Sequence, residues 1–203
     1  YDKKEVAFFM KKMTGIIIST AIIVFSIVSF AFADELHWGF KKATDGNQIE
    51  ISSELENMLA KYDAIYRGDP QAKTIYLTFD NGYENGFTER ILDALKEEDV
   101  PATFFLTGHY VTSASDLVKR MVKDGHIIGN HSDKHPNMAR LSEAQMLTEW
   151  QNFDKKLKEV TGLERTYYTR PPEGVYNETL LAVGAKNDYR HIFWSIAFKD
   201  WEK

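Results

Sequence analysis

The sequence predicts an α/β fold in which helices cover parallel strands, arranged either as a barrel or as a doubly wound sheet. Two observations support this prediction. From Thr74 onward, short runs rich in β-branched and aromatic residues alternate with amphipathic helical patterns, at the spacing of βα units. Charged side chains also gather just after these runs, where parallel α/β proteins place their functional sites.

The N-terminal part of the chain precedes this alternation. Residues 1–9 have no role that the sequence assigns. Residues 10–33 have the three parts of an export signal: the positive Lys11 and Lys12, an apolar stretch, and the cleavage box Ala31-Phe32-Ala33. The alternative is a membrane anchor, since the apolar stretch is nearly long enough to span a bilayer. Either way, we expect an exported chain that touches the membrane only if this segment stays uncleaved.

Residues 34–73 form an N-terminal extension that is mixed and polar. Within it, residues 51–66 carry apolar positions at helical spacing, and Ser52 or Ser53 is a suitable helix cap. We therefore expect one helix in the extension and the start of the main domain at residue 74.

The domain from residue 74 to residue 203 supplies the strands and helices. The β-rich runs cover residues 74–79, 102–108, 126–130, 166–169 and 191–195. The helical patterns between them cover Phe87–Glu98, Ser115–Lys123, Ser142–Val160 and Asn177–Lys186. The longest of these begins with Ser142-x-x-Gln145, a capping box in which each side chain bonds the other residue's backbone N–H.

Composition excludes several classes of protein. The chain has 203 residues, a net charge of −5 and no cysteine. Without a basic patch it is not expected to bind nucleic acid. Without cysteine it can have no disulfide, thiolate metal site or Cys nucleophile, so its hydrophobic core must hold the fold together. We expect a monomer.

Chemically active side chains follow four of the five predicted strands. These are Asp80 and Asn81 at the first strand, His131 and His135 after the third, Arg170 after the fourth, and Asp200 and Trp201 after the fifth. In a parallel fold they would meet at one edge of the sheet. Taken alone, Asn81-Gly82 is also a common hairpin turn, and Arg170 could form only a surface ion pair.

The pair His131-x-x-x-His135 is the strongest candidate for a metal site. On a helix the two imidazoles would share one face, but Pro136 follows directly, so a loop is expected. A histidine pair of this spacing is a weak signal by itself. Two imidazoles and an oxygen ligand would nevertheless make an open divalent site, and Asp80 could be a ligand, a general base or a turn residue.

With these residues in view, the chain resembles the polysaccharide deacetylases of the NodB homology type, carbohydrate esterase family four. "TFDNG" (78–82), "HSDKH" (131–135), "RPPEG" (170–174) and "AFKDW" (197–201) resemble four of that family's five motifs, in order. The resemblance covers about residues 74–203. It implies a distorted parallel (β/α) barrel that removes acetyl groups from an N-acetylated glycan.

The resemblance also implies individual roles. Asp80 would be the catalytic base, and Arg170 would orient it. His131 and His135 would hold one divalent metal ion, zinc or similar, with Asn81 at the third position. The residues implied to contact the substrate, peptidoglycan glycan strands, are Tyr83, Pro171, Asp200 and Trp201.

Two departures from the family pattern are important. The family has a metal-binding Asp where this chain has Asn81, and Ala197 replaces the first Asp of the fourth motif. The fifth motif, L-x-L-H, carries the family's catalytic acid and does not follow Trp201, so we expect a barrel truncated at its C-terminal end.

Three stretches, "FDNGYENG" (79–86), "RPPEGV" (170–175) and "FWSIAFKDW" (193–201), together most resemble the subgroup that deacetylates N-acetylmuramic acid to form muramic δ-lactam in the spore cortex. Three alternatives stay open: a catalytically impaired carbohydrate-binding protein, a deacetylase of another polysaccharide, or a different metal-dependent amide or ester hydrolase.

Overall fold

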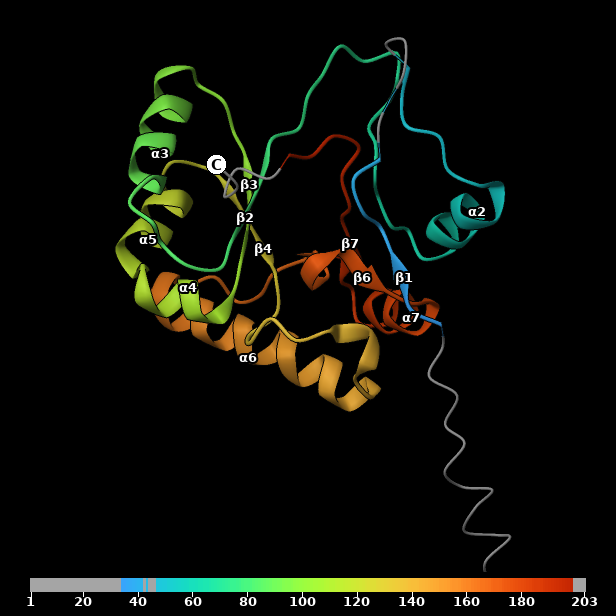
Figure 1. Ribbon diagram of the computed structural model, residues 1–203. Coiled ribbons are helices and arrows are strands. Elements are labelled where there is room, and N and C mark those ends of the chain that lie inside the picture. The colour runs from blue at the N-terminus through green and yellow to red at the C-terminus, as the bar shows by residue number, and fades with distance from the viewer. Residues whose placement is uncertain (1–33, 42, 44–46, 199–203) are drawn as a thin grey trace, which may run out of the picture. The chain divides into compact units, whose positions relative to one another are not determined.

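The computed structural model describes residues 34–41, 43 and 47–198 (Figure 1). The predicted export segment 10–33, together with Asp200 and Trp201, lies outside the described residues. In the parts of the chain that the structure describes, none of the helices is both long and apolar enough to cross a membrane.

Five parallel strands form the central sheet and confirm the predicted α/β class. They are β2 (Thr78–Asn81), β3 (Thr103–Leu106), β4 (Ile127–Asn130), β5 (Tyr168–Thr169) and β7 (Arg190–His191). Their spatial order follows the order along the chain, and every neighbouring pair is parallel. Beyond β7, Ile65 forms an isolated parallel bridge with Ile192. All carboxyl ends of the strands therefore lie at one edge of the sheet.

Helices connect and cover these strands, and each predicted helix is present. They are α2 (Ser53–Lys61), α3 (Thr88–Glu97), α5 (Ser115–Lys123), α6 (Glu143–Thr161) and α7 (Glu178–Lys186), with the unpredicted α4 (Gly108–Ser113). Two short 3₁₀ turns, η1 (Met138–Arg140) and η2 (Pro172–Gly174), lie in loops. The capping box of Ser142 and Gln145 is formed as expected, and Ser52 caps α2.

A second, antiparallel pair of strands was not predicted. β1 (Leu36–His37) pairs with β6 (Val175–Tyr176). Trp38, next to β1, is buried and donates its indole N–H to the carbonyl of Trp194 at 2.8 Å. The segment around β1 therefore packs in the same core as the loops that follow β5 and β7.

The first predicted strand begins later than the sequence indicates. Residues 75–77 are largely apolar, but β2 begins only at Thr78, and Ile75 and Tyr76 are 85% and 73% exposed. The reason is pairing: β2 is an edge strand of the described sheet, and neighbouring β3 begins only at Thr103. Apolar, β-branched composition favours a strand but does not supply the partner that a strand needs.

The helix α6 links two hydrophobic clusters and is the main scaffold of the fold. Met146 and Trp150 belong to a cluster with Trp38 and with residues of α2 and α7. Phe153 and Leu157 belong to a second cluster with residues of α3, α5 and β3. Because α6 packs in both clusters, it can hold the neighbouring loops in place.

His191, in β7, is an uncompensated polar group in this core. Its side chain is buried, packs beside Gly184 and Trp150, and neither ring nitrogen has a hydrogen-bond partner among the described residues. Because burial penalises the charged imidazolium, it lowers the pKa of His191 to about 3.

This residue should make the fold sensitive to acid. In the unfolded chain the pKa of a histidine is about 6.5, so between that value and about 3 only the unfolded state binds the proton. The stability that neutral His191 maintains is present above pH 6.5 and is lost as the pH falls toward 3. Between pH 7 and pH 4.5 we expect the free energy of unfolding to fall by roughly 2–3 kcal/mol through this group alone.

The variant His191→Leu tests this expectation, because it keeps the size of the side chain and removes the titration. Urea unfolding at both pH values should show an acid loss smaller by roughly 2–3 kcal/mol in the variant. Equal acid losses in the two proteins would show that His191 is not the acid-sensitive group.

Candidate active site at the carboxyl ends of the strands

An ion pair between Asp80 and Arg170 lies at the carboxyl edge of the sheet. Asp80 belongs to β2, and Arg170 directly follows β5. The guanidinium Nη1 donates to Asp80 Oδ1 at 2.7 Å and to Thr78 Oγ1 at 2.9 Å. The Arg170 side chain is 4% exposed, whereas that of Asp80 is 37% exposed. The guanidinium of the pair is therefore buried, whereas the carboxylate is partly accessible to solvent.

Contacts on every side hold the Arg170 guanidinium. Its Nε donates to the carbonyl of Ile192 at 3.1 Å, and its Nη2 donates to the carbonyl of Phe193 at 3.2 Å. The guanidinium also lies over the Phe105 ring, 4.1 Å from its centroid. Because the planar group is fixed by these contacts, it determines where the Asp80 carboxylate points.

His131 and His135 lie next to this pair, on the loop after β4. His131 Nδ1 is 2.8 Å from the carbonyl of Arg170, which can only accept, so Nδ1 carries the proton and Nε2 is free to bind. The centroids of the two imidazole rings are 4.9 Å apart. Burial lowers the pKa of His131, an effect that the charge of Asp80 opposes. The neutral imidazole that results is the form that binds a metal ion.

The loop itself has the non-helical shape expected from Pro136. Ser132 Oγ accepts a hydrogen bond from the backbone N–H of His135 at 2.9 Å. Ser132 and His135 both have left-handed backbone conformations, with φ of 67° and 60°. The two histidines are thus brought together by a tight turn.

Asn81 offers an oxygen that nothing else in the described structure uses. Its Oδ1 is buried and has no hydrogen-bond partner among the described residues. A buried, unpaired amide oxygen is costly unless it binds something. Within residues 34–41, 43 and 47–198, no three His, Cys, Asp or Glu side chains are placed to hold one metal ion. Two imidazoles with the amide oxygen of Asn81 nevertheless fit a divalent cation in chemical type.

Two of the residues expected to contact substrate differ in their exposure to solvent. Tyr83 is 79% exposed, and its ring packs against His109 with centroids 4.7 Å apart. Pro171, in contrast, is buried and directly precedes η2. Contact of Tyr83 and Pro171 with a glycan stays a prediction.

Several contacts of the site were missed by sequence reasoning. Thr78 could have been found, because it lies two positions before Asp80 and so faces the same side of the strand. The carbonyls of Ile192 and Phe193 carry no sequence signal, because any residue would supply them.

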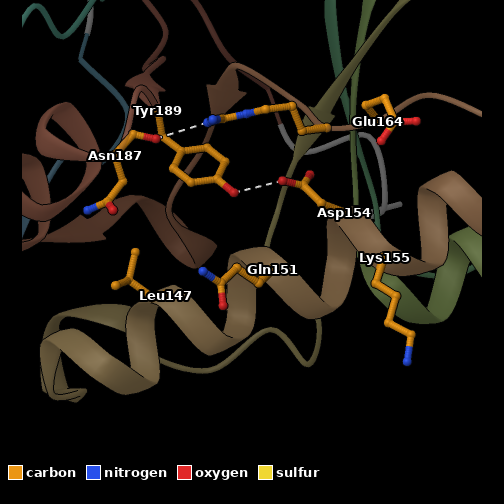
Figure 2. A pocket seen from close by; sticks show the side chains of 8 residues that line it. Leu147, Gln151, Asp154, Lys155, Glu164, Asn187 and Tyr189 are labelled. Carbon is orange, nitrogen blue, oxygen red and sulfur yellow. Dashed lines mark hydrogen bonds between the residues drawn. The ribbon is translucent and has the colours of Figure 1, made fainter.

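Two cavities lie away from this site. One of about 330 Å³ is lined by residues of α6 together with Asn187 and Tyr189 (Figure 2). Another of about 340 Å³ also includes Tyr189, which directly precedes β7. Both lie beside the amino ends of β5 and β7, and neither includes the ion pair or His131. The candidate site is therefore located by its charges and hydrogen bonds, and not by either of these two cavities.

Comparisons with known proteins agree with this geometry. The sequence profile described as "Polysaccharide deacetylase" matches residues 67–192. An uncharacterised 30.6 kDa protein of Geobacillus stearothermophilus is 52% identical, over 88% of this chain and 68% of its own length. The peptidoglycan-N-acetylmuramic acid deacetylase PdaA of Bacillus subtilis (strain 168) is 43% identical, over 83% of this chain and 64% of its own length.

A solved structure shows the same fold. The structure of Bacillus subtilis PdaA, described as a family 4 carbohydrate esterase, superposes with a TM-score of 0.80 and 42% identity, covering 83% of this chain and 72% of that chain. The chain thus spans about two thirds of the length of the curated relatives reported above. Deacetylases of this family generally depend on a metal ion. By its profile match, its relatives and its fold, the chain belongs to the polysaccharide deacetylase family, hydrolases that act on carbon–nitrogen bonds other than peptide bonds.

Proposed function

We propose that the protein removes the acetyl group from N-acetylmuramic acid in peptidoglycan, a step toward muramic δ-lactam in the spore cortex. The observation that carries the proposal is the Asp80–Arg170 pair beside two imidazoles at the carboxyl edge of the sheet. The choice of sugar is supported by the name of the 43% identical relative. The protein would act outside the cytoplasmic membrane as a monomer, bound to the membrane only through an uncleaved segment 10–33.

The residues that would hold a divalent metal ion are His131, His135 and Asn81. The free Nε2 of His131 and the unpaired Oδ1 of Asn81 are the donors that favour this assignment. A bound ion would polarise the acetamide carbonyl and make a water molecule more acidic.

Asp80 is the proposed general base. It takes a proton from water as the water oxygen forms a bond to the acetyl carbon. The carbon–nitrogen bond then breaks, acetate leaves, and the sugar nitrogen gains a proton to become an amine. Arg170 does not touch the substrate in this scheme. It is a positioning residue that keeps the Asp80 carboxylate aimed out of the sheet.

Mass spectrometry of digested peptidoglycan tests the choice of substrate. After incubation with the intact protein, muramic residues should lose an acetyl group, with release of one acetate per residue. Loss only from glucosamine residues would support a deacetylase of different specificity. No loss from either sugar would favour the carbohydrate-binding alternative, for which Asn81 in place of the family's Asp is the specific argument.

Asn81→Asp should tighten metal binding. A carboxylate oxygen carries charge and an amide oxygen does not, and ligand charge strongly tunes the affinity of oxygen sites for divalent ions. We expect a dissociation constant at least about tenfold lower, measured by competition with a chelator. Unchanged affinity would show that residue 81 is not a ligand and that Asn81-Gly82 serves only as a turn.

A further inference from the structure

The loop that carries the two histidines adopts a backbone shape that it would not keep by itself. Ser132 and His135 both lie in the left-handed region, with φ of 67° and 60°. Residues with side chains rarely adopt this region without support from their surroundings. Hydrogen bonds to residues outside the site supply that support.

The first support is Asn130, the last residue of β4. Its side chain is fully buried, and Oδ1 accepts the backbone N–H of Ser132 at 2.9 Å. On its other side, Nδ2 donates to the carbonyl of Trp150 at 3.1 Å and lies 3.4 Å from both Asp154 Oδ1 and Thr166 Oγ1. One amide thus joins the histidine loop to α6.

The second support is the carboxylate of Asp154, which is buried within α6. It accepts from the backbone N–H of Thr166 at 3.1 Å and from Thr166 Oγ1 at 2.6 Å. It also accepts from the Tyr189 hydroxyl at 2.7 Å (Figure 2). Burial, reinforced by the hydrogen bond to Asp154, raises the pKa of Tyr189, so its hydroxyl stays a donor. Moving a carboxylate from water into the protein interior costs free energy when only neutral groups donate hydrogen bonds to it. The buried Asp154 carboxylate therefore points to a specific role.

Two more side chains of α6 hold the same loop. Glu149 Oε2 accepts the backbone N–H of Lys134 at 2.8 Å, and Lys156 Nζ pairs with Asp133 Oδ1 at 2.5 Å. Asp133 is seated so close to α4 that a Cβ at Gly108 would lie 1.9 Å from its Oδ1. The loop is therefore held from α6 on one side and limited by α4 on the other.

We infer that Asn130 and Asp154 are positioning residues for the metal site, and that α6 acts through them to set the geometry of His131 and His135. This inference rests on the proposed metal-binding function. Asn130 fixes Ser132, whose hydroxyl in turn fixes the backbone of His135. Asp154 orients the Asn130 amide so that its oxygen, and not its nitrogen, faces Ser132.

The test is metal affinity, measured on the folded protein by competition of Zn²⁺ with a chelator. Supports of metal ligands typically change affinity 10- to 100-fold, so Asn130→Ala should weaken Zn²⁺ binding by about that factor. With Co²⁺ in place of Zn²⁺, its visible absorption spectrum should also change, because the ligands move.

Leu157→Ala is the control for loss of stability. Leu157 lies on the same helix and is fully buried, but it belongs to the second hydrophobic cluster and not to the hydrogen-bonded chain. This variant should lower the Tm while leaving the Zn²⁺ affinity and the Co²⁺ spectrum of the folded protein unchanged.

A milder pair of variants decides the question if Asn130→Ala does not fold. Thr166→Val removes the hydroxyl that donates to Asp154. Thr161→Val removes a hydroxyl that donates to the carbonyl of Leu157 and accepts the backbone N–H of Leu163, with no bond to Asn130 or Asp154. We expect at least threefold weaker Zn²⁺ binding in the first and no change in the second.

Failure of the proposed metal site and failure of the positioning inference give different results. If the unaltered protein binds no Zn²⁺, the proposed metal site is wrong and the inference falls with it. If the unaltered protein binds Zn²⁺ and the folded Asn130→Ala and Thr166→Val variants bind it equally well, only the inference is overturned.

Discussion

Replacing Asp80 with Asn should lower kcat for acetate release by about 10²–10⁴-fold, the usual contribution of a general base. The amide keeps the size of the side chain and can still accept the hydrogen bond from Arg170, but it cannot take a proton from water. Zn²⁺ affinity should change little, because Asp80 is not among the proposed ligands. The measurement is initial-rate acetate release from peptidoglycan at saturating substrate.

The matched control for this variant is Asp116→Asn. Asp116 lies on α5, its side chain is 96% exposed, and it pairs only with the neighbouring Lys119 among the described ion pairs. Its replacement should leave acetate release unchanged. Retention of more than about a tenth of the activity in Asp80→Asn would assign the proton transfer to another group.

Arg170→Lys should damage both activity and stability, although it keeps the charge. A lysine cannot make the separate hydrogen bonds that the guanidinium makes to Asp80, Ile192 and Phe193. Buried groups would lose their partners, so the free energy of unfolding should fall by about 3 kcal/mol or more. We expect kcat to fall at least about 100-fold, because a misaligned base is inefficient.

Arg140→Lys is the comparison for this variant. Arg140 also pairs with a carboxylate, that of Glu35, but its side chain is 69% exposed. Urea unfolding should show a change below about 0.5 kcal/mol. If Arg170→Lys is as mild as Arg140→Lys in both unfolding and turnover, Arg170 is not the residue that positions Asp80.

Much of the fold could be predicted because local signals agree with tertiary contacts. The runs at 102–108 and 126–130 contain buried strands of the sheet, and helix α6 begins where its capping box predicts. The cluster of Asp80, Arg170 and the two histidines could be predicted for a related reason. In a parallel sheet, residues after successive strands meet at one edge whatever their separation in the sequence.

Other features depend on partners that are distant in sequence. The pairing of β1 with β6 joins residues far apart along the chain, and no local pattern specifies it. The burial of Asp154 has the same origin, because its donors come from Asn130, Thr166 and Tyr189. In the sequence of the helix, Asp154 cannot be distinguished from an aspartate exposed to solvent.

Acetate release during metal titration tests the central claim most directly. The intact protein, treated with a chelator and then dialysed, should release no acetate from peptidoglycan. Activity should return in proportion to added Zn²⁺ and reach its plateau at about one ion per chain, as expected for a single site. The variant carrying His131→Ala and His135→Ala should stay inactive at the same ion concentrations. Full acetate release by the chelated protein, or recovery by the double variant, would contradict a catalytic metal held by these two histidines.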